Sequence, residues 1–224
     1  LISPSQAAGA NDVIARIMAA RLGEALNVQV VVDNRGGAGG MIGADITAKA
    51  TPDGYTLLAA SLATHSILPH VYRNAPYDAV RDFEPVALFA IVPNLMTSGL
   101  SFAPNNVKEL VDLLRKNPGK YNYSSLGNGS GSHLSMELVK NMTRTFMLHI
   151  PYNGAPPAAA ALATGDVQAA FLPATVMAPF VQSGRIRILA VSTRERFPLT
   201  PDVPTVEESG GLKGFDSHGW NGIL

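Results

Sequence analysis

The sequence has no cysteine, no excess of charge of either sign and no long apolar run. The absence of cysteine excludes disulfides, thiolate metal sites and cysteine nucleophiles. Its 17 basic residues balance 17 acidic ones and form no basic run, so nucleic acid and anionic membranes are poor candidates for partners. No apolar stretch reaches the roughly 18 residues that a membrane-spanning helix needs. The remaining composition, 46% hydrophobic and 15% charged, is typical of a folded protein with one large domain or two small ones.

Strand-like and helix-like segments alternate along the chain. Apolar, β-prone segments predict strands at residues 1–5, 28–33, 55–60, 86–92, 121–126, 146–152, 167–172 and 185–192. Helical spacing of apolar residues predicts helices between them, and Asn11 is the expected cap of the first helix. Residues 28–33 are nearly all apolar, which predicts a strand covered on both faces. The alternation predicts βαβ units and an α/β fold with a mostly parallel sheet, in which ligands bind beyond the carboxyl ends of the strands.

Five loops of small and polar residues follow predicted strands, and they contain almost no charged side chains. They comprise residues 6–10, 61–66, 127–132, 153–157 and 173–175. The first N–H groups of a helix have no internal partner and its dipole favours negative charge, so such loops suit an anion. We therefore predict that the protein binds a small carboxylated ligand through dipoles, hydroxyls and water.

The loop at residues 127–132 is the most informative of the five. It separates a predicted strand from a predicted helix that resumes at His133. Glycine permits close approach of a ligand to the backbone, and serine hydroxyls can donate hydrogen bonds to it. Two interpretations stay open from this segment alone: an anion-binding cradle, or a surface turn in which Ser132 caps the helix.

A second glycine-rich segment, residues 36–40, fits no nucleotide-binding motif. A Gly-x-Gly-x-x-Gly register that starts at Gly37 would need a third glycine at position 42, where isoleucine stands. No Gly-Lys-Ser/Thr follows either, so the Walker pattern is absent. Close packing of the backbone is the predicted reason for these glycines.

No catalytic constellation is complete in the sequence. Ser132 and His133 are adjacent, and adjacent residues on a helix point about 100° apart, so they do not face each other. No Gly-x-Ser-x-Gly elbow is present, and the five histidines form no His-x-x-x-His set. His65 and His133 stay a candidate zinc pair if a carboxylate joins them, although a structural or ligand-facing histidine is the commoner case. Asp12 is a candidate general base, or a first-turn residue that pairs with the helix dipole. Binding is therefore favoured over catalysis.

Several motifs together are similar to those of one known family. Residues 33–44, Asp-Asn-Arg-Gly-Gly-Ala-Gly-Gly-Met-Ile-Gly-Ala, resemble the NRPGAGGNIGA signature of the tripartite tricarboxylate transporter receptors, also called the Bug family. Further similar segments occur over essentially the whole length, at residues 52–58, 82–86, 117–120, 149–155, 189–192 and 202–208.

The resemblance implies a periplasmic solute-binding protein with the two-lobed, Venus-flytrap architecture of type II binding proteins and a ligand cleft between the lobes. Lobe 1 is expected at residues 1–98, lobe 2 at 99–212 and a return to lobe 1 at 213–224. A signal peptide and a C-terminal part of lobe 1 are expected outside the given chain. The family implies no cofactor, no metal ion and no catalytic residue. It implies a monomer that hands its ligand to the membrane permease subunits of a tripartite transporter.

The resemblance also implies which residues contact the ligand. Two loops are expected to bind a carboxylate: Ala8, Gly9, Ala10, Asn11 and Asp12 in the first, and Ser125, Gly127, Gly129, Ser130, Ser132 and His133 in the second. Other loops are expected to line the distal end of a dicarboxylate, tricarboxylate, amino acid or aromatic acid: Ala63, Thr64, His65, Gly154, Ala155, Pro173, Ala174 and Thr175. This chain has Ala7-Ala8-Gly9 where the family usually has Pro-Gly-Gly, and alanine at position 8 restricts positive φ.

Two other functions are weighed against the carboxylate receptor. One is a ligand sensor that signals to a partner protein, because the same fold serves receptors and regulators. The other is a hydrolase that uses Ser132 or His133. Co-purification with a permease or with a sensor kinase separates the first from the receptor, and turnover of an ester or amide identifies the second.

Overall fold

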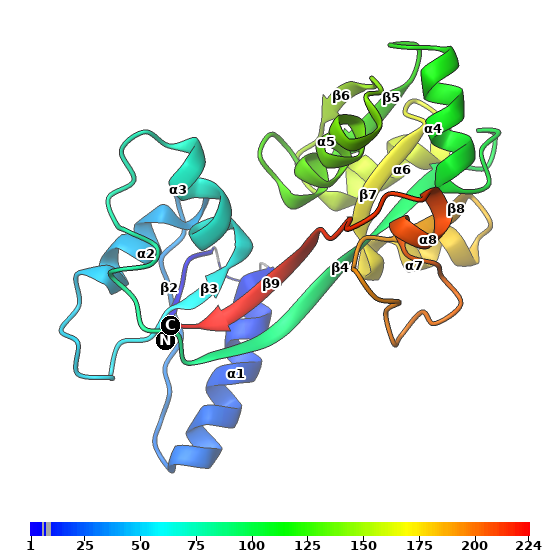
Figure 1. Ribbon diagram of the computed structural model, residues 1–224. Coiled ribbons are helices and arrows are strands. Elements are labelled where there is room, and N and C mark those ends of the chain that lie inside the picture. Colours follow the sequence, from blue (N-terminus) through cyan, green and yellow to red (C-terminus); the bar gives the residue numbers. More distant parts are fainter. Residues whose placement is uncertain (6, 8–9) are drawn as a thin grey trace. The chain divides into compact units, whose positions relative to one another are not determined.

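The computed structural model describes residues 1–5, 7 and 10–224, which fall into two units (Figure 1). Unit 1 comprises Leu1–Ile91 and Trp220–Leu224, and unit 2 comprises Val92–Gly219. The chain passes from one unit to the other inside strand β4 (Ala87–Gly99) and again inside strand β9 (His218–Ile223). The lobe borders expected after residues 98 and 212 stay predictions.

Unit 1 is built from short elements. In chain order they are β1 (Ile2–Ser3), α1 (Ala10–Leu26), β2 (Asp33–Asn34), the 3-10 turn η1 (Ala38–Gly40), α2 (Met41–Ala48), β3 (Ala59–Ser61), the π-helical turn η2 (Ala63–Ile67) and α3 (Leu68–Val71). β1 pairs in parallel with β2, and a parallel bridge joins Ile2 to Leu58 just before β3. The loops after β1 and β3 therefore leave the same edge of unit 1. An apolar core that includes Ile2, Met41, Leu58 and Tyr77 lies beneath them.

The glycine-rich segment of unit 1 packs its backbone closely against its neighbours, as predicted. A Cβ added at Gly40 would lie 2.8 Å from Cγ2 of Thr64. Gly40 also has a φ of 107°, in the left-handed region that favours glycine. A Cβ added at Gly43, on α2, would lie 2.9 Å from the carbonyl oxygen of Arg35 and 2.9 Å from Cα of Pro4. These glycines hold α2 against the loops that follow β1 and β2.

Unit 2 alternates strands with longer helices. After β4 come α4 (Val107–Lys116), β5 (Asn122–Ser125), α5 (Gly131–Thr143), β6 (Leu148–Pro151), α6 (Ala155–Thr164), β7 (Ala169–Pro173), α7 (Ala174–Gln182), β8 (Ile186–Val191) and α8 (Val206–Gly210). The strands and helices predicted in this part of the chain are confirmed, with boundary shifts of a few residues. Asn117-Pro118-Gly119 follows α4, and Gly165 ends α6 in the left-handed conformation, as is typical of helix ends.

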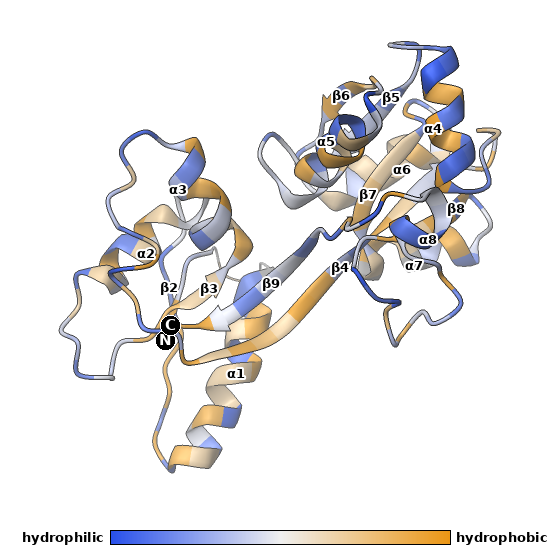
Figure 2. Cartoon of the chain, viewed as in Figure 1, coloured by the Kyte–Doolittle hydropathy of each residue, from blue (hydrophilic) through white to orange (hydrophobic). Residues whose placement is uncertain are grey.

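The sheet of unit 2 is covered on both faces, because successive side chains of a strand point to opposite sides. On β7, Ala169 and Phe171 lie in one apolar cluster with residues of α4, α5 and α8. Ala170 and Leu172 lie in a second cluster with residues of α6 and α7. Figure 2 shows hydrophobic and hydrophilic residues alternating along α4, whose four apolar contacts with the core are all buried. The result is a three-layer α/β/α arrangement.

The strand pairings are mixed, not mostly parallel. β5 pairs in parallel with β6 and with β7, whereas β4 is antiparallel to β7 and to β8, and β3 is antiparallel to β9. None of the helices among the described residues combines the length and apolar character needed to cross a bilayer.

Two local predictions in unit 1 are wrong. Of the predicted strand at residues 28–33 only Asp33 lies in a strand, β2, and Val28 and Val31 are 55% and 63% exposed. Among the described strands β2 pairs with β1 alone, so it is an edge strand of a two-stranded sheet. An apolar run by itself does not distinguish a central strand from an edge strand. Asn11 is not the cap of α1, because the helix begins at Ala10.

We predict that Gly43→Ala lowers the free energy of unfolding by about 1 kcal/mol net, since overpacking costs about 1–3 kcal/mol and alanine recovers up to about 1 kcal/mol of helix propensity. Denaturant titration measures this change. Ile46→Ala, on an exposed position of the same helix, is the matched control and should change stability less. A stabilising effect of Gly43→Ala would contradict the close approach of α2 to Arg35 and Pro4.

Candidate functional site

Three loops of unit 2 leave the same edge of its sheet. Since β5 lies between β6 and β7 and is parallel to both, the carboxyl ends of the three strands lie side by side. The segments that follow them, residues 126–130, residues 152–154 and the direct junction of β7 with α7, lead into the first turns of α5, α6 and α7. No Asp, Glu, Lys or Arg occurs in these connections. Helix N-termini surrounded by neutral residues are suited to an anion.

Ser130 caps helix α5. Its Oγ accepts a hydrogen bond from the backbone N–H of His133 at 3.3 Å and donates one to the carbonyl oxygen of Gly127 at 2.6 Å. The interpretation of Ser132 as the cap is therefore wrong. Ser132 is the second residue of the helix, only 3% exposed, and its Oγ accepts the N–H of Leu126 at 2.9 Å. Both Ser130 and Ser132 have hydroxyls near the start of α5, and the conformation of the turn decides which of the two is the cap.

Ser125 ties the loop to the neighbouring strand. Its Oγ accepts the N–H of Gly127 at 3.1 Å and lies 2.5 Å from Nε2 of His149 on β6. Backbone bonds also join the loop regions, since the N–H of Tyr152 donates to the carbonyl oxygen of Ser125 at 3.0 Å. The hydroxyls of the loop are thus engaged within the protein, and they shape the backbone that faces outward.

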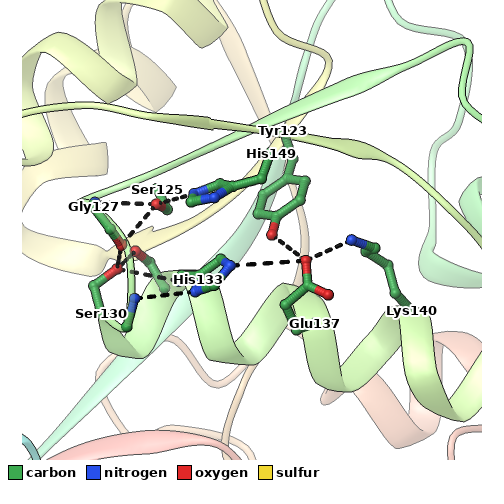
Figure 3. A network of polar contacts seen from close by, with 10 residues as sticks. Tyr123, Ser125, Gly127, Ser130, His133, Glu137, Lys140 and His149 are labelled. Atoms are coloured by element: carbon green, nitrogen blue, oxygen red, sulfur yellow. Dashed lines mark hydrogen bonds and ion pairs between the residues drawn. The ribbon is translucent and has the colours of Figure 1, made fainter. Parts of the chain in front are cut away.

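Three rings lie close together beside the loop (Figure 3). The rings of His133 and His149 have centroids 4.1 Å apart and an interplanar angle of 23°. The ring of Tyr123 lies 4.9 Å from that of His149 at 22°, and 6.5 Å from that of His133 at 9°. Tyr123 and His149 are register partners on β5 and β6, whereas His133 comes from α5, so the stack depends on strand pairing and helix packing together.

The hydrogen bonds of His133 indicate which ring nitrogen carries its proton. The backbone N–H of Gly129 donates to Nδ1 of His133 at 3.2 Å, so this nitrogen carries a lone pair. In the neutral ring the proton is then on Nε2, which lies 3.9 Å from Oε1 of Glu137. Both ring nitrogens therefore face protein groups.

Glu137 connects the stack to Lys140. Its Oε1 accepts hydrogen bonds of 2.5 Å from the hydroxyl of Tyr123 and from the ammonium of Lys140. The Lys140 nitrogen also lies 5.3 Å from the centre of the Tyr123 ring and 5.1 Å from that of Phe146. The positive charge of Lys140 thus lies near the glutamate and two aromatic faces.

The network has a defined ionisation near neutral pH. Burial raises the pKa of Glu137, but the bonds from Lys140 and Tyr123 outweigh it, so the pKa is lowered overall and the group is a carboxylate. Burial, and then the bond to Glu137, raises the pKa of Tyr123, which stays a phenol. Burial lowers the pKa of His149, and the repulsion that a charged neighbouring ring of His133 would exert lowers it further, so the His149 ring is neutral.

Sequence reasoning named His133 but missed its partners Tyr123, Glu137, Lys140 and His149. A signal existed, since His133, Glu137 and Lys140 are spaced to lie on one helical face. The position of His149 beside Tyr123 had no local signal, because it depends on the register between β5 and β6.

In unit 1, Asp12 lies in the first turn of α1 as an ion-paired residue. Its carboxylate accepts bonds from Arg16 at 3.0 Å and from the Asn34 side chain at 2.8 Å, and it is 2% exposed. Asn34 also donates to the carbonyl oxygen of Ser5 at 3.3 Å, which ties the loop after β1 to the loop after β2. These bonds support the first-turn interpretation of Asp12 over a general base.

The other expected residues of this loop are only partly described. Ala8 and Gly9 lie outside the described residues, and Ala10 is the first residue of α1. The side chain of Asn11 accepts a hydrogen bond from that of Asn221, on β9, at 3.1 Å.

Ala63, Thr64 and His65 lie in the π-helical turn η2. The Thr64 hydroxyl is buried. It accepts a hydrogen bond from the backbone N–H of Ser61 and donates one to the Ser61 carbonyl oxygen, and it lies 2.9 Å from Nδ1 of His65. The His65 ring packs edge-on to Phe83 at 4.6 Å, and burial lowers its pKa to about 4. Its Nε2 is buried and has no hydrogen-bond partner among the described residues. His65 is thus a neutral ring at physiological pH.

The remaining expected residues lie at the sheet edge of unit 2. Gly154 precedes α6 with a φ of 106°, and Ala155 begins that helix. Pro173 ends β7, while Ala174 and Thr175 begin α7. The structure therefore brings these residues to the same edge as the loop at 126–130.

The geometry does not join Ser132 and His133 as a nucleophile and its base. Among the described residues no hydrogen bond joins Ser132 to His133, and the two side chains have different partners, Leu126 and Gly129. Within residues 1–5, 7 and 10–224, no group of three or more His, Asp or Glu side chains is placed to hold a metal ion. His65 belongs to unit 1 and His133 to unit 2.

Comparison with known proteins identifies one family. A sequence model described as "Tripartite tricarboxylate transporter family receptor" matches residues 14–224. The chain spans 66%, 65% and 64% of the length of three curated relatives that it matches, which is slightly less than two thirds.

Several solved structures share the fold. A protein of R. palustris solved with adipate is 36% identical with a TM-score of 0.80, and the match covers 99% of this chain and 74% of the other. MatC from Rhodopseudomonas palustris, solved with bound malate, is 30% identical with a TM-score of 0.76, covering 99% and 75%. The periplasmic binding protein BugD is 36% identical with a TM-score of 0.75, covering 99% and 74%. These matches confirm the predicted fold class of periplasmic solute-binding proteins.

The ionisation of Glu137 predicts a pH-dependent contribution to stability. Its pKa is lower in the folded chain than the ordinary 4.5, so the contribution is present above that pH and is lost as the pH falls through the folded value. Glu137→Gln resembles the protonated group and should destabilise the protein at neutral pH and much less near pH 3. Denaturation midpoints at both pH values measure this, with Glu195→Gln, an exposed glutamate of unit 2, as the control. Equal destabilisation at both pH values would contradict the prediction.

Proposed function

Because this chain belongs to the family of tripartite tricarboxylate transporter receptors, we propose that it is an extracytoplasmic receptor for a small organic carboxylate. It captures the acid and delivers it to the permease subunits of a tripartite membrane transporter. The similar protein BugD is named a periplasmic binding protein, which supports the periplasm as the location of this protein too.

The observation that carries this proposal is the sheet edge of unit 2. The helices α5, α6 and α7 all begin there, and the segments that lead into them carry no ionised side chain. A carboxylate at this edge is stabilised by helix dipoles and backbone N–H groups, which need no counter-charge. The internal bonds of Ser125, Ser130 and Ser132 hold the loop in place before a ligand arrives, and such preorganisation lowers the entropic cost of binding.

We propose that the ligand contacts the backbone of residues 127–132 and the starts of α6 and α7. The residues concerned are Gly127, Gly129, Ser130, Gly154, Ala155, Pro173, Ala174 and Thr175. Ser125 and Ser132 shape the loop through their internal bonds. The family resemblance extends the proposal to Ala8–Asp12 and Ala63–His65 of unit 1, whose contribution stays a prediction.

The ligand class follows from charge and from the similar proteins. The connections at the edge are neutral, so a di- or tricarboxylate, an amino acid or an aromatic acid is compatible with them. Two of the similar proteins were solved with adipate and with malate, both dicarboxylates. We propose a dicarboxylate as the ligand of this protein.

Native mass spectrometry of the purified protein, followed by denaturation, tests the proposal first, because it identifies any acid that is released. Isothermal titration with adipate, malate, tricarboxylates, amino acids and aromatic acids follows, with the corresponding amides as uncharged controls. Binding of at least one acid and of none of the amides is expected. Failure of every acid to bind ligand-stripped protein would overturn the proposal.

Delivery to a transporter is tested in cells. Deletion of the gene should abolish uptake of the identified acid, and reintroduction of the gene should restore it. Unchanged uptake, together with co-purification of a sensor kinase, would replace delivery with signalling.

We predict that Asn128→Asp weakens binding of the acid about five- to tenfold, because a charge placed within several ångströms of a carboxylate costs about 1 kcal/mol in a partly solvated site. Asn128 is exposed on the loop before α5, and the substitution keeps its shape. Asn141→Asp makes the same change at an exposed position near the C-terminal end of α5, far from the loop. Titration calorimetry compares the two variants. Equal effects on affinity would contradict binding at the start of α5.

A further inference from the structure

The geometry points to His133 as a positioning residue that holds the loop before α5 only while its ring is neutral, so that binding depends on its protonation. This inference rests on the proposed function and gives His133 a role other than contact with the ligand. It derives from the hydrogen bond between Gly129 and the ring, and from the groups that surround the ring.

The bond from Gly129 requires a lone pair on Nδ1 of His133. The N–H of Gly129 lies 3.2 Å from this nitrogen, and Gly129 has a φ of 74° at the tip of the turn. An imidazolium has two N–H donors and no acceptor. Protonation of His133 at Nδ1 therefore removes the hydrogen bond from Gly129 and leaves two N–H donors facing each other.

The charged and titratable groups around His133 come from three elements. Glu137, on the same helix, lies 3.9 Å from Nε2 and favours a positive ring, whereas the nearby cation of Lys140, two turns along α5, opposes it. From β5, the Tyr123 ring lies 6.5 Å away and stays neutral. From β6, the His149 ring stacks at 4.1 Å, so only one of the two rings is readily charged.

Loss of the Gly129 bond acts on the loop that we propose to face the ligand. Gly129 lies between Gly127, which accepts from Ser130, and Ser130, which caps α5. A change at Gly129 therefore displaces backbone groups at the start of the helix. The bond lies at the tip of a partly exposed turn, so its loss is expected to rearrange the loop without unfolding the core.

Two substitutions of His133 separate the acceptor from the charge. His133→Asn keeps an uncharged oxygen acceptor close to the position of Nδ1, whereas His133→Leu removes the acceptor. His70→Gln, at an exposed histidine of unit 1, controls for the loss of a titrating histidine. Adipate is the probe, and its own carboxyl groups titrate identically in every variant.

The first measurement follows the Gly129 amide by NMR in ligand-free protein between pH 8 and pH 5, where histidines change charge. The chemical shift of the Gly129 amide is expected to change with pH in the native protein and in His70→Gln, and to stay constant in His133→Asn. Nitrogen chemical shifts of the His133 ring should report a proton on Nε2 at the upper pH. A Gly129 amide shift that does not change with pH in the native protein would overturn the inference. This measurement needs no ligand.

The second measurement compares affinity for adipate over the same range. The native protein should lose about five- to tenfold more affinity at low pH than His133→Asn does, the size expected for one net hydrogen bond. His133→Leu should bind weakly at both pH values. Tighter binding by the native protein at low pH would show that a charged His133 attracts the ligand directly, and would overturn the positioning role. If adipate binds at no pH, adipate is excluded as ligand while the amide titration still decides the role of His133.

Discussion

The parallel pairing of β5 with both β6 and β7 is the constraint on which the candidate site depends. It brings three strand ends to one edge, and each strand end leads into a helix within a few residues. Helix N-termini accumulate at that edge, and their unpaired N–H groups favour an anion. The same pairing places His149 beside Tyr123, next to the loop before α5.

The loop before α5 is shaped mainly by its own hydrogen bonds. Ser125, Ser130 and Ser132 each bond to backbone groups within a few residues, and His133 accepts from Gly129. Buried polar networks that are fully satisfied rigidify a site, whereas the loss of one member leaves its partners unpaired. A single proton on His133 is therefore sufficient to disturb this loop, while the apolar clusters on either side of the sheet are unaffected.

The family predicted from the sequence motifs is confirmed by the family match over residues 14–224. The glycine-rich signature at residues 33–44 has a structural explanation in unit 1, where Gly40 and Gly43 permit close contact of α2 with Thr64, Arg35 and Pro4. Asn34 of the same signature bonds Asp12 and the loop after β1. The signature thus maintains the loops of unit 1 and does not form a phosphate-binding turn.

The sequence by itself determined the α/β class, the alternation of elements in unit 2, the family and the neutral loops after the strands, because periodicity, turn residues and composition are local properties. Only the tertiary structure decided that Ser130 caps α5, that residues 28–32 are not a strand, and that the sheets are mixed. It also decided the stack of Tyr123, His149 and His133 and the proton position on His133. These features depend on strand register and helix packing between residues far apart in the chain, and no local pattern encodes such contacts.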